Sequence, residues 1–134
     1  MRGVILAGGL GSRLAPLTKL VNKHCLPLGP HHSMIEFPLK TLLQTNIKDI
    51  MIICGPERLG SFIELLGSGK DYNCDFTYKV QDKPDGIAGA LKLCEQFVNG
   101  HKCAVILGDN VYEDDLSKEI ADFEYNTRVR RYFM

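Results

Sequence analysis

Three glycines within four positions stand directly after the first apolar run of the chain, at Gly8, Gly9 and Gly11. Glycines let main-chain N–H groups approach an anion without interference from side chains. Arg13 follows two positions later, and the donor fork of a guanidinium matches phosphate oxygens in pairs. The loop therefore favours a phosphate site. Glycines also occur in tight turns between a strand and a helix. The glycines alone favour neither interpretation over the other.

The loop matches neither of two common phosphate-binding motifs. A dinucleotide fingerprint that begins at Gly9 needs a third glycine at position 14, where the chain has Leu14. A P-loop needs Lys and then Ser or Thr after its last glycine, and here Ser12 and Arg13 follow. Main-chain amides followed at once by an arginine instead suit a polyphosphate.

Lys23 and Asp109 are two further charged side chains that could act on a phosphate. Lys23 precedes the apolar stretch 26–28, so its ammonium would lie beside a buried surface as a mobile charge for a phosphoryl group in transfer. Asp109 follows the last apolar run, and a carboxylate at the end of a buried parallel strand is a typical Mg²⁺ ligand. Each residue also has a purely structural interpretation: Lys23 could be a surface lysine, and Asp109 could cap a turn. For Lys23 taken alone, a surface lysine is the commoner case.

The segment 81–90, QDKPDGIAGA, combines a turn signal with polar groups that suit a nucleobase. Gln81 offers both a donor and an acceptor to the edge of a base. The exposed backbone around Gly86 could add a second contact. Taken alone, this pattern is a weak indication of base binding.

The segments that would position these residues are of two kinds, which alternate along the chain. Short β-branched and aliphatic runs predict buried strands, and apolar residues at helical spacing predict helices between them. The strand at 75–80 has apolar residues alternating with polar ones, so we expect it near a sheet edge. The predicted strands are 3–7, 49–54, 75–80 and 103–107, and the predicted helices are 35–44, 58–66, 87–98 and 115–123, the last capped by Asp114 or Asp115.

This alternation predicts a Rossmann-like, three-layer α/β/α fold with a mainly parallel sheet and helices on both faces. Open sheets of this kind bind ligands at the carboxyl ends of their strands, which is where the glycine loop, Gln81 and Asp109 fall. The 134 residues suit one domain, and the small number of strands predicts a truncated form of a larger fold. The chain could be a fragment, a truncated product, or half of a site that another chain completes.

The composition argues against several classes of protein. Lys and Arg number 16 against 16 Asp and Glu, so the basic excess typical of nucleic-acid binders is missing. The apolar runs are too short to span a bilayer, and the start of the chain is unlike a signal peptide. Five cysteines without a CxxC pair disfavour a disulfide framework or a zinc site. We therefore expect a cytoplasmic protein with reduced thiols and with no nucleic-acid or membrane partner.

Five motifs occur in one order with compatible spacing: GVILAGGLGSRLAPLT, KHCLPL, MIEFPL, VQDKPDGIAGAL and AVILGDN. Together they resemble the amino-terminal half of the sugar-1-phosphate nucleotidyltransferases, and most nearly the glucose-1-phosphate thymidylyltransferase branch of that family. The resemblance extends to about Ile120, and it implies a nucleotide-binding half at 1–123 followed by a divergent basic and aromatic tail at 124–134. It implies transfer of a nucleotidyl group from a nucleoside triphosphate to a sugar 1-phosphate, with release of pyrophosphate. The expected donor is dTTP, with UTP as the alternative, and the expected acceptor is glucose 1-phosphate.

The resemblance also implies roles for single residues. Arg13 would grip the triphosphate and Lys23 would bind the phosphates around the reacting phosphorus, as the catalytic pair. Asp109 would ligate Mg²⁺, the expected cofactor. The implied nucleotide-binding residues are Leu6, Gly8, Gly9, Gly11, Ser12, Gln81, Gly86 and Asn110, with Gln81 and Gly86 reading the pyrimidine base.

The chain departs from the family pattern in places, one of them Gly89, where the family often has glutamine. The family's catalytic domain is also longer, and its second half carries the sugar pocket and a further metal-binding Asp. We therefore expect this chain alone to bind a nucleoside triphosphate weakly and to catalyse poorly. We also expect it to associate with itself or with a separate second half. A non-catalytic subunit that binds a nucleotide or nucleotide-sugar is the alternative.

Overall fold

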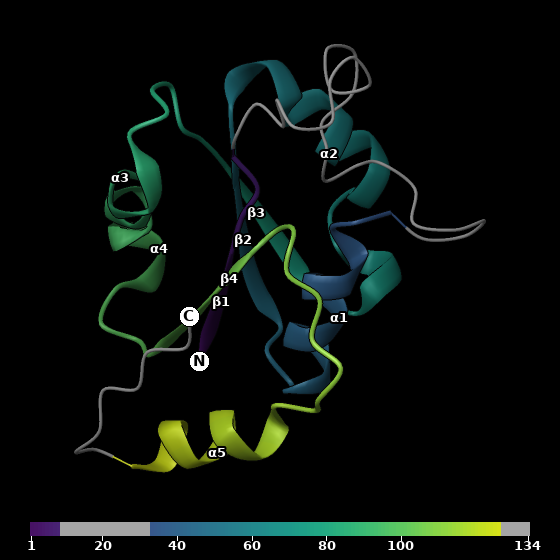
Figure 1. Ribbon diagram of the computed structural model, residues 1–134, viewed down its shortest axis with the longest axis vertical. Helices are drawn as coiled ribbons and strands as arrows, with labels where there is room; N and C mark the ends of the chain where they lie inside the picture. Colours follow the sequence, from purple (N-terminus) through teal and green to yellow (C-terminus); the bar gives the residue numbers. More distant parts are fainter. Residues whose placement is uncertain (9–32, 127–134) are drawn as a thin grey trace.

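The computed structural model describes residues 1–8 and 33–126, and within them four strands form one parallel sheet (Figure 1). The strands are β1 (Arg2–Leu6), β2 (Asp49–Cys54), β3 (Asp75–Val80) and β4 (Cys103–Leu107). Their order across the sheet is β3-β2-β1-β4, with every neighbouring pair parallel. The predicted parallel α/β fold and the edge position of the third strand are confirmed.

Helices cover both faces of the sheet, because each crossover between parallel strands must pass over one face. In Figure 1, α1 (Glu36–Gln44) and α2 (Leu59–Leu66) lie on one face, and α3 (Gly86–Leu93) and α4 (Glu95–Val98) on the other. Two short 3₁₀ turns, η4 (Pro56–Arg58) and η5 (Lys70–Tyr72), join elements on the first face, and α5 (Ser117–Tyr125) follows β4.

Two apolar clusters, one on each face, form the core. Along β1, Ile5 belongs to the cluster under α1 and α2, whereas Val4 and Leu6 belong to the cluster under α3 and α4, as the alternation of side chains along a strand requires. The first cluster is the larger and includes the fully buried Phe62 of α2. Most of the apolar burial that stabilises the fold therefore lies on the α1 and α2 face.

The β4 edge of the sheet is less covered than its centre. Val105 in the middle of β4 is 39% exposed, whereas Val4, its partner in β1, is fully buried. A mainly apolar groove of about 660 Å³ runs along this edge, between side chains of α3 such as Leu91 and side chains near α5 such as Leu116. An uncovered strand with apolar neighbours is a surface suited to association.

The ends of some helices differ from the sequence prediction. The helix predicted over 87–98 is broken at Cys94 into α3 and α4. The last helix begins at Ser117, and Leu116 rather than an Asp occupies its N-cap position. Asp115 nevertheless accepts hydrogen bonds from the backbone N–H and the hydroxyl of Ser117, which lower the pKa of the Asp115 carboxyl.

The cysteines in the described ranges agree with the expectation of reduced thiols. Cys54, Cys74, Cys94 and Cys103 are thiols that take part in no disulfide bond. Burial raises the pKa of the Cys94 thiol to about 11, so this side chain behaves as a small apolar residue of the core. None of the helices that the structure describes has the length and hydropathy needed to span a bilayer.

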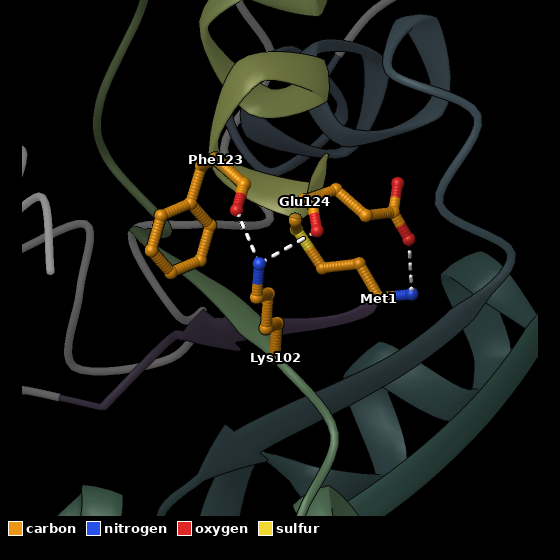
Figure 2. A network of polar contacts seen from close by, with 4 residues as sticks. All are labelled: Met1, Lys102, Phe123 and Glu124. Atoms are coloured by element: carbon orange, nitrogen blue, oxygen red, sulfur yellow. Dashed lines mark hydrogen bonds and ion pairs between the residues drawn. The ribbon is translucent and has the colours of Figure 1, made fainter. Parts of the chain in front are cut away.

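A polar network at the amino ends of β1 and β4 holds the end of α5 in place (Figure 2). Nζ of Lys102 donates to the carbonyl oxygens of Phe123 at 2.5 Å, Glu124 at 2.6 Å and Asn126 at 3.1 Å. The amino-terminal ammonium of Met1 forms an ion pair of 3.0 Å with Oε1 of Glu124. The contacts of Lys102 supply donors to carbonyl groups that the C-terminus of a helix leaves without intrahelical partners.

Candidate functional site

The carboxyl ends of the four strands meet at one edge of the sheet, because all strands run in the same direction. Backbone hydrogen bonds continue just past the strand ends and fix the start of each loop. The N–H of Gln81 donates to Cys54 O at 2.8 Å, and the N–H of Gly108 donates to Leu6 O at 2.9 Å. The residues that leave this edge therefore start from defined positions.

Gln81 and Gly8 lie close together, although they follow strands on opposite sides of β2. A Cβ placed on Gly8 would lie 3.3 Å from Oε1 of Gln81. The glutamine side chain therefore extends past the end of β2 towards the start of the glycine loop. Since glycine has no side chain, the acceptor of Gln81 can approach the main chain there.

The amide nitrogen of Gln81 points to the other side, towards the turn before α3. Nε2 donates to Oδ1 of Asp85 at 2.5 Å and to the carbonyl oxygen of Gly86 at 3.2 Å. The structure thus brings together Gln81 and Gly86, the two residues predicted to read a base. It also adds Asp85, which the sequence analysis treated only as part of a turn signal.

Gly86 begins α3 with a φ of +84°. This left-handed conformation is costly for any residue with a Cβ and is readily adopted by glycine. The glycine is exposed, and a Cβ placed on it would meet no atom within 4 Å. The requirement for glycine at this position therefore comes from the backbone conformation and not from lack of space.

Asp109 and Asn110 leave the end of β4, at the opposite side of the site from Gln81. Asn110 is held in a turn by its backbone N–H, which donates to Leu107 O at 3.1 Å. Its side-chain Nδ2 donates to the hydroxyl of Tyr112 at 3.3 Å. Asp109 itself is exposed, so its carboxylate is accessible to a ligand from solvent.

The donor set at Asp109 suits a hard cation that is shared with a substrate. In residues 1–8 and 33–126, no three or more His, Cys, Asp or Glu side chains are grouped so that they could hold a metal ion. A cage built from protein ligands alone is therefore not present in this part of the chain. Mg²⁺ commonly takes one or two carboxylates and completes its shell with phosphate oxygens and water, which fits a single Asp109.

The strand order places the described site residues in a line across the sheet edge. Gln81 follows β3, Gly8 follows β1 and Asp109 follows β4, with β3 and β4 at the two edges. Three strand spacings of about 4.8 Å separate β3 from β4, about 14 Å in total. The side chain predicted to bind a base, the start of the glycine loop and the carboxylate of Asp109 thus follow one another along this edge. The span suits an extended nucleotide.

Several residues predicted for the site lie outside the described ranges. These are Gly9, Gly11, Ser12, Arg13 and Lys23. Their roles in binding the triphosphate stay predictions.

Known proteins match this chain in sequence over nearly its whole length. Residues 2–131 match the family model described as nucleotidyl transferase. The glucose-1-phosphate thymidylyltransferase of Neisseria meningitidis is 43% identical over 112 residues, which cover 84% of this chain and 38% of that protein. The enzyme of the same name from Mycolicibacterium smegmatis is 38% identical over 126 residues, covering 93% and 43% respectively.

Solved structures show the same fold. A Bacillus anthracis structure assigned to glucose-1-phosphate thymidylyltransferase, in complex with sucrose, has a TM-score of 0.88 and 51% identity, and covers 92% of this chain and 50% of its own. A UDP-glucose pyrophosphorylase complexed with UDP-glucose has a TM-score of 0.75 at 20% identity, covering 92% and 53%, and shares the fold alone. The chain spans between about two fifths and one half of the length of these relatives.

Proposed function

Because this chain belongs to the nucleotidyl transferase family, we propose that it forms the nucleotide-binding half of a sugar-1-phosphate nucleotidyltransferase. The observation that carries the proposal is the line of Gln81, Gly8 and Asp109 along the carboxyl edge of the parallel sheet. In this proposal the base lies beside Gln81, and the phosphates lie beside the glycine loop and Asp109. Relatives named glucose-1-phosphate thymidylyltransferase support dTTP and glucose 1-phosphate as the substrates.

The proposed reaction needs no covalent enzyme intermediate. An oxygen of the sugar 1-phosphate attacks the α-phosphorus of the nucleoside triphosphate, a new P–O bond forms, and the bond to the leaving pyrophosphate breaks. Catalysis then consists of placing the two substrates in line and neutralising their charge. Arg13 and Lys23 supply positive charge around the phosphates in this proposal.

The described residues have separate tasks in this scheme. Gln81 and the backbone at Gly86 hold the base, and Gly8 leaves room for the nucleotide beside the Gln81 acceptor. Asp109 holds Mg²⁺, which when bound offsets the negative charge of the phosphates. Leu6 and Asn110 line the same edge of the sheet, at the ends of β1 and β4.

Nucleotide titration with and without Mg²⁺ tests this function. We expect the purified chain to bind dTTP in calorimetric titration and to bind it more tightly when Mg²⁺ is present. UTP, CTP and ATP serve as comparison ligands, and tighter binding of UTP than of dTTP would favour a uridylyltransferase. Failure to bind any nucleoside triphosphate with Mg²⁺ would refute the proposal.

A non-catalytic binding subunit is the second candidate function. It is favoured because the described residues contain no group of three or more His, Cys, Asp or Glu side chains that could hold a metal ion. Pyrophosphate release, measured with dTTP, glucose 1-phosphate and Mg²⁺, separates the two candidates. We expect binding with little turnover from this chain alone, and robust turnover would contradict the idea that it depends on a second half.

Association is a further part of the proposal. The β4 edge with its apolar groove supports the expectation that the chain forms oligomers or pairs with a second half. Light scattering over a range of concentrations measures this directly. A stable monomer at high concentration would count against it.

A further inference from the structure

Asp85 occupies the N-cap position of α3 but does not cap the helix. Asp is among the residues that cap helices best, through hydrogen bonds to the first backbone N–H groups, yet no such bond forms here. Its Oδ1 instead accepts the hydrogen bond from Nε2 of Gln81 at 2.5 Å. The carboxylate is therefore directed towards the side chain that, in the proposed function, reads the base.

Gly89 provides the space for this position of Asp85. A Cβ placed on Gly89 would overlap the carboxylate of Asp85. Asp85 would then have to rotate away, and its contact with Gln81 would be lost. Glycine is an unfavourable residue inside a helix, and Gly89 lies within α3. Alanine at position 89 would make the helix more stable, whereas the observed position of the Asp85 side chain requires glycine there.

The contact with Asp85 decides which end of the Gln81 amide faces the ligand. A primary amide has a donor end and an acceptor end of nearly equal size, and half a turn exchanges them. The carboxylate of Asp85 and the carbonyl of Gly86 are both acceptors, so the donor Nε2 must face them. The acceptor Oε1 is thereby directed towards Gly8.

An acceptor held in this direction distinguishes between pyrimidine bases. Uracil and thymine carry a hydrogen on ring atom N3 and can donate it to Oε1, whereas N3 of cytosine has a lone pair and would face another acceptor. We propose that Asp85 is a positioning residue that fixes the amide of Gln81, with Gly89 making room for it, so that the site selects uracil or thymine over cytosine. This inference rests on the proposed function, and it adds the residues that orient Gln81 in that same site.

The test compares dUTP with dCTP, which have the same sugar and phosphates. In calorimetric titrations with Mg²⁺, we expect the unmodified chain to bind dUTP about fivefold more tightly, the discrimination that one net hydrogen bond supplies. Asp85→Ala and Gly89→Ala should both bring the ratio close to one. Asp82→Ala is the control, since it removes a negative charge from an exposed position in the same loop and should leave the ratio unchanged.

Two readouts separate a positioning role from a merely structural one. Gly89→Ala should keep or raise the unfolding temperature while it lowers the dUTP to dCTP ratio, because alanine favours the helix. In NMR spectra of the nucleotide-free chain, the side-chain amide of Gln81 should lose its protection from exchange in Asp85→Ala and Gly89→Ala but not in Asp82→Ala.

The outcomes that overturn this inference differ from those that overturn the proposed function. An unchanged ratio in Asp85→Ala or Gly89→Ala, or equal binding of dUTP and dCTP by the unmodified chain, would overturn the role of Asp85 and leave nucleotide binding intact. Absence of binding for both nucleotides and for inorganic tripolyphosphate would overturn the proposed function together with this inference.

Discussion

The two ends of the parallel sheet both carry polar side chains, but these side chains have different partners. At the amino end, Lys102 donates to three carbonyl groups at the end of α5, and the ammonium of Met1 pairs with Glu124 (Figure 2). At the carboxyl end, the acceptor of Gln81 is directed towards Gly8, and Asp109 is exposed at the end of β4. The first group of contacts fastens a helix, whereas the second group lies at the carboxyl edge of the sheet, where open parallel sheets bind ligands.

This difference indicates where substitutions should affect stability and where they should affect binding. Contacts made within the chain contribute to the free energy of unfolding, because unfolding breaks them. Groups that a ligand contacts add to stability when that ligand binds, because binding favours the folded state. The amino end should therefore respond to mutation through stability, and the carboxyl end through nucleotide affinity.

The largest expected effect is that of Asp109→Asn on binding at the carboxyl end. The substitution keeps the shape of the side chain and removes its charge, so the gain in dTTP affinity caused by Mg²⁺ should disappear. Loss of one partner of a close charge pair costs about 2 kcal/mol or more, or about thirtyfold in affinity. Calorimetric titration with Mg²⁺ and with EDTA measures the gain.

Glu64→Gln is the matched control for Asp109→Asn, since it removes one negative charge from an exposed position on α2. It should leave the Mg²⁺-dependent gain in affinity unchanged. If Asp109→Asn retained the full Mg²⁺-dependent gain in affinity, Asp109 would not be the metal ligand. The expectation that substitutions at the carboxyl end act on nucleotide affinity would then fail at this residue.

Gly86→Ala should lower the stability of the fold, although Gly86 belongs to the candidate site. Alanine at a φ of +84° would destabilise the fold by about 1.5 kcal/mol, because an L-residue is strained in the left-handed region. Urea unfolding measures this change. Gly60→Ala provides the contrast, since Gly60 lies in α2 with open space around its Cα and with no positive φ, and it should stabilise the fold slightly. Equal effects from the two substitutions would contradict this explanation.

The sheet and the residues at its carboxyl end could be predicted because local sequence determines them. The runs at 49–54, 75–80 and 103–107 are apolar, rich in β-branched or aromatic residues and bounded by turn signals, and the structure has strands with these bounds. In a parallel sheet, the residue types that follow the strands then gather at one edge. The positions of Gln81 and Asp109 at this edge were predicted in this way.

The contacts that depend on distant parts of the chain could not be predicted from local patterns. From the sequence, Lys102 looks like an ordinary charged residue before a strand. Its role appears only when α5 is placed near the amino ends of β1 and β4 (Figure 1). Asp85 was overlooked because a Pro-Asp-Gly turn already accounts for an Asp at that position. The break at Cys94 also escaped prediction, because helical spacing of apolar residues continues through it.

Lys102→Met should have a smaller effect, confined to stability, at the amino end. The substitution keeps the apolar stem of the side chain and removes the donor to Phe123 O and Glu124 O. We expect a loss of about 1 kcal/mol in the free energy of unfolding, since these carbonyls are partly open to water. Affinity for dTTP should not change. Lys70→Met, at an exposed position in η5, should change neither quantity, and a loss of affinity in Lys102→Met would contradict the division between the two ends.

The smallest expected effect is that of Glu124→Gln on the ion pair with the Met1 ammonium. The carboxylate side chain is 46% exposed, and exposed ion pairs contribute at most about 0.5 kcal/mol because water and salt screen them. The stability difference between Glu124→Gln and the unmodified chain should therefore be largest in dilute buffer and vanish near 1 M salt, where the screening length is about 3 Å. A difference that persisted in high salt would mean that Glu124 stabilises α5 through packing rather than charge. In that case, of the contacts drawn in Figure 2, those between Lys102 and the carbonyl groups would alone hold α5 by electrostatic attraction.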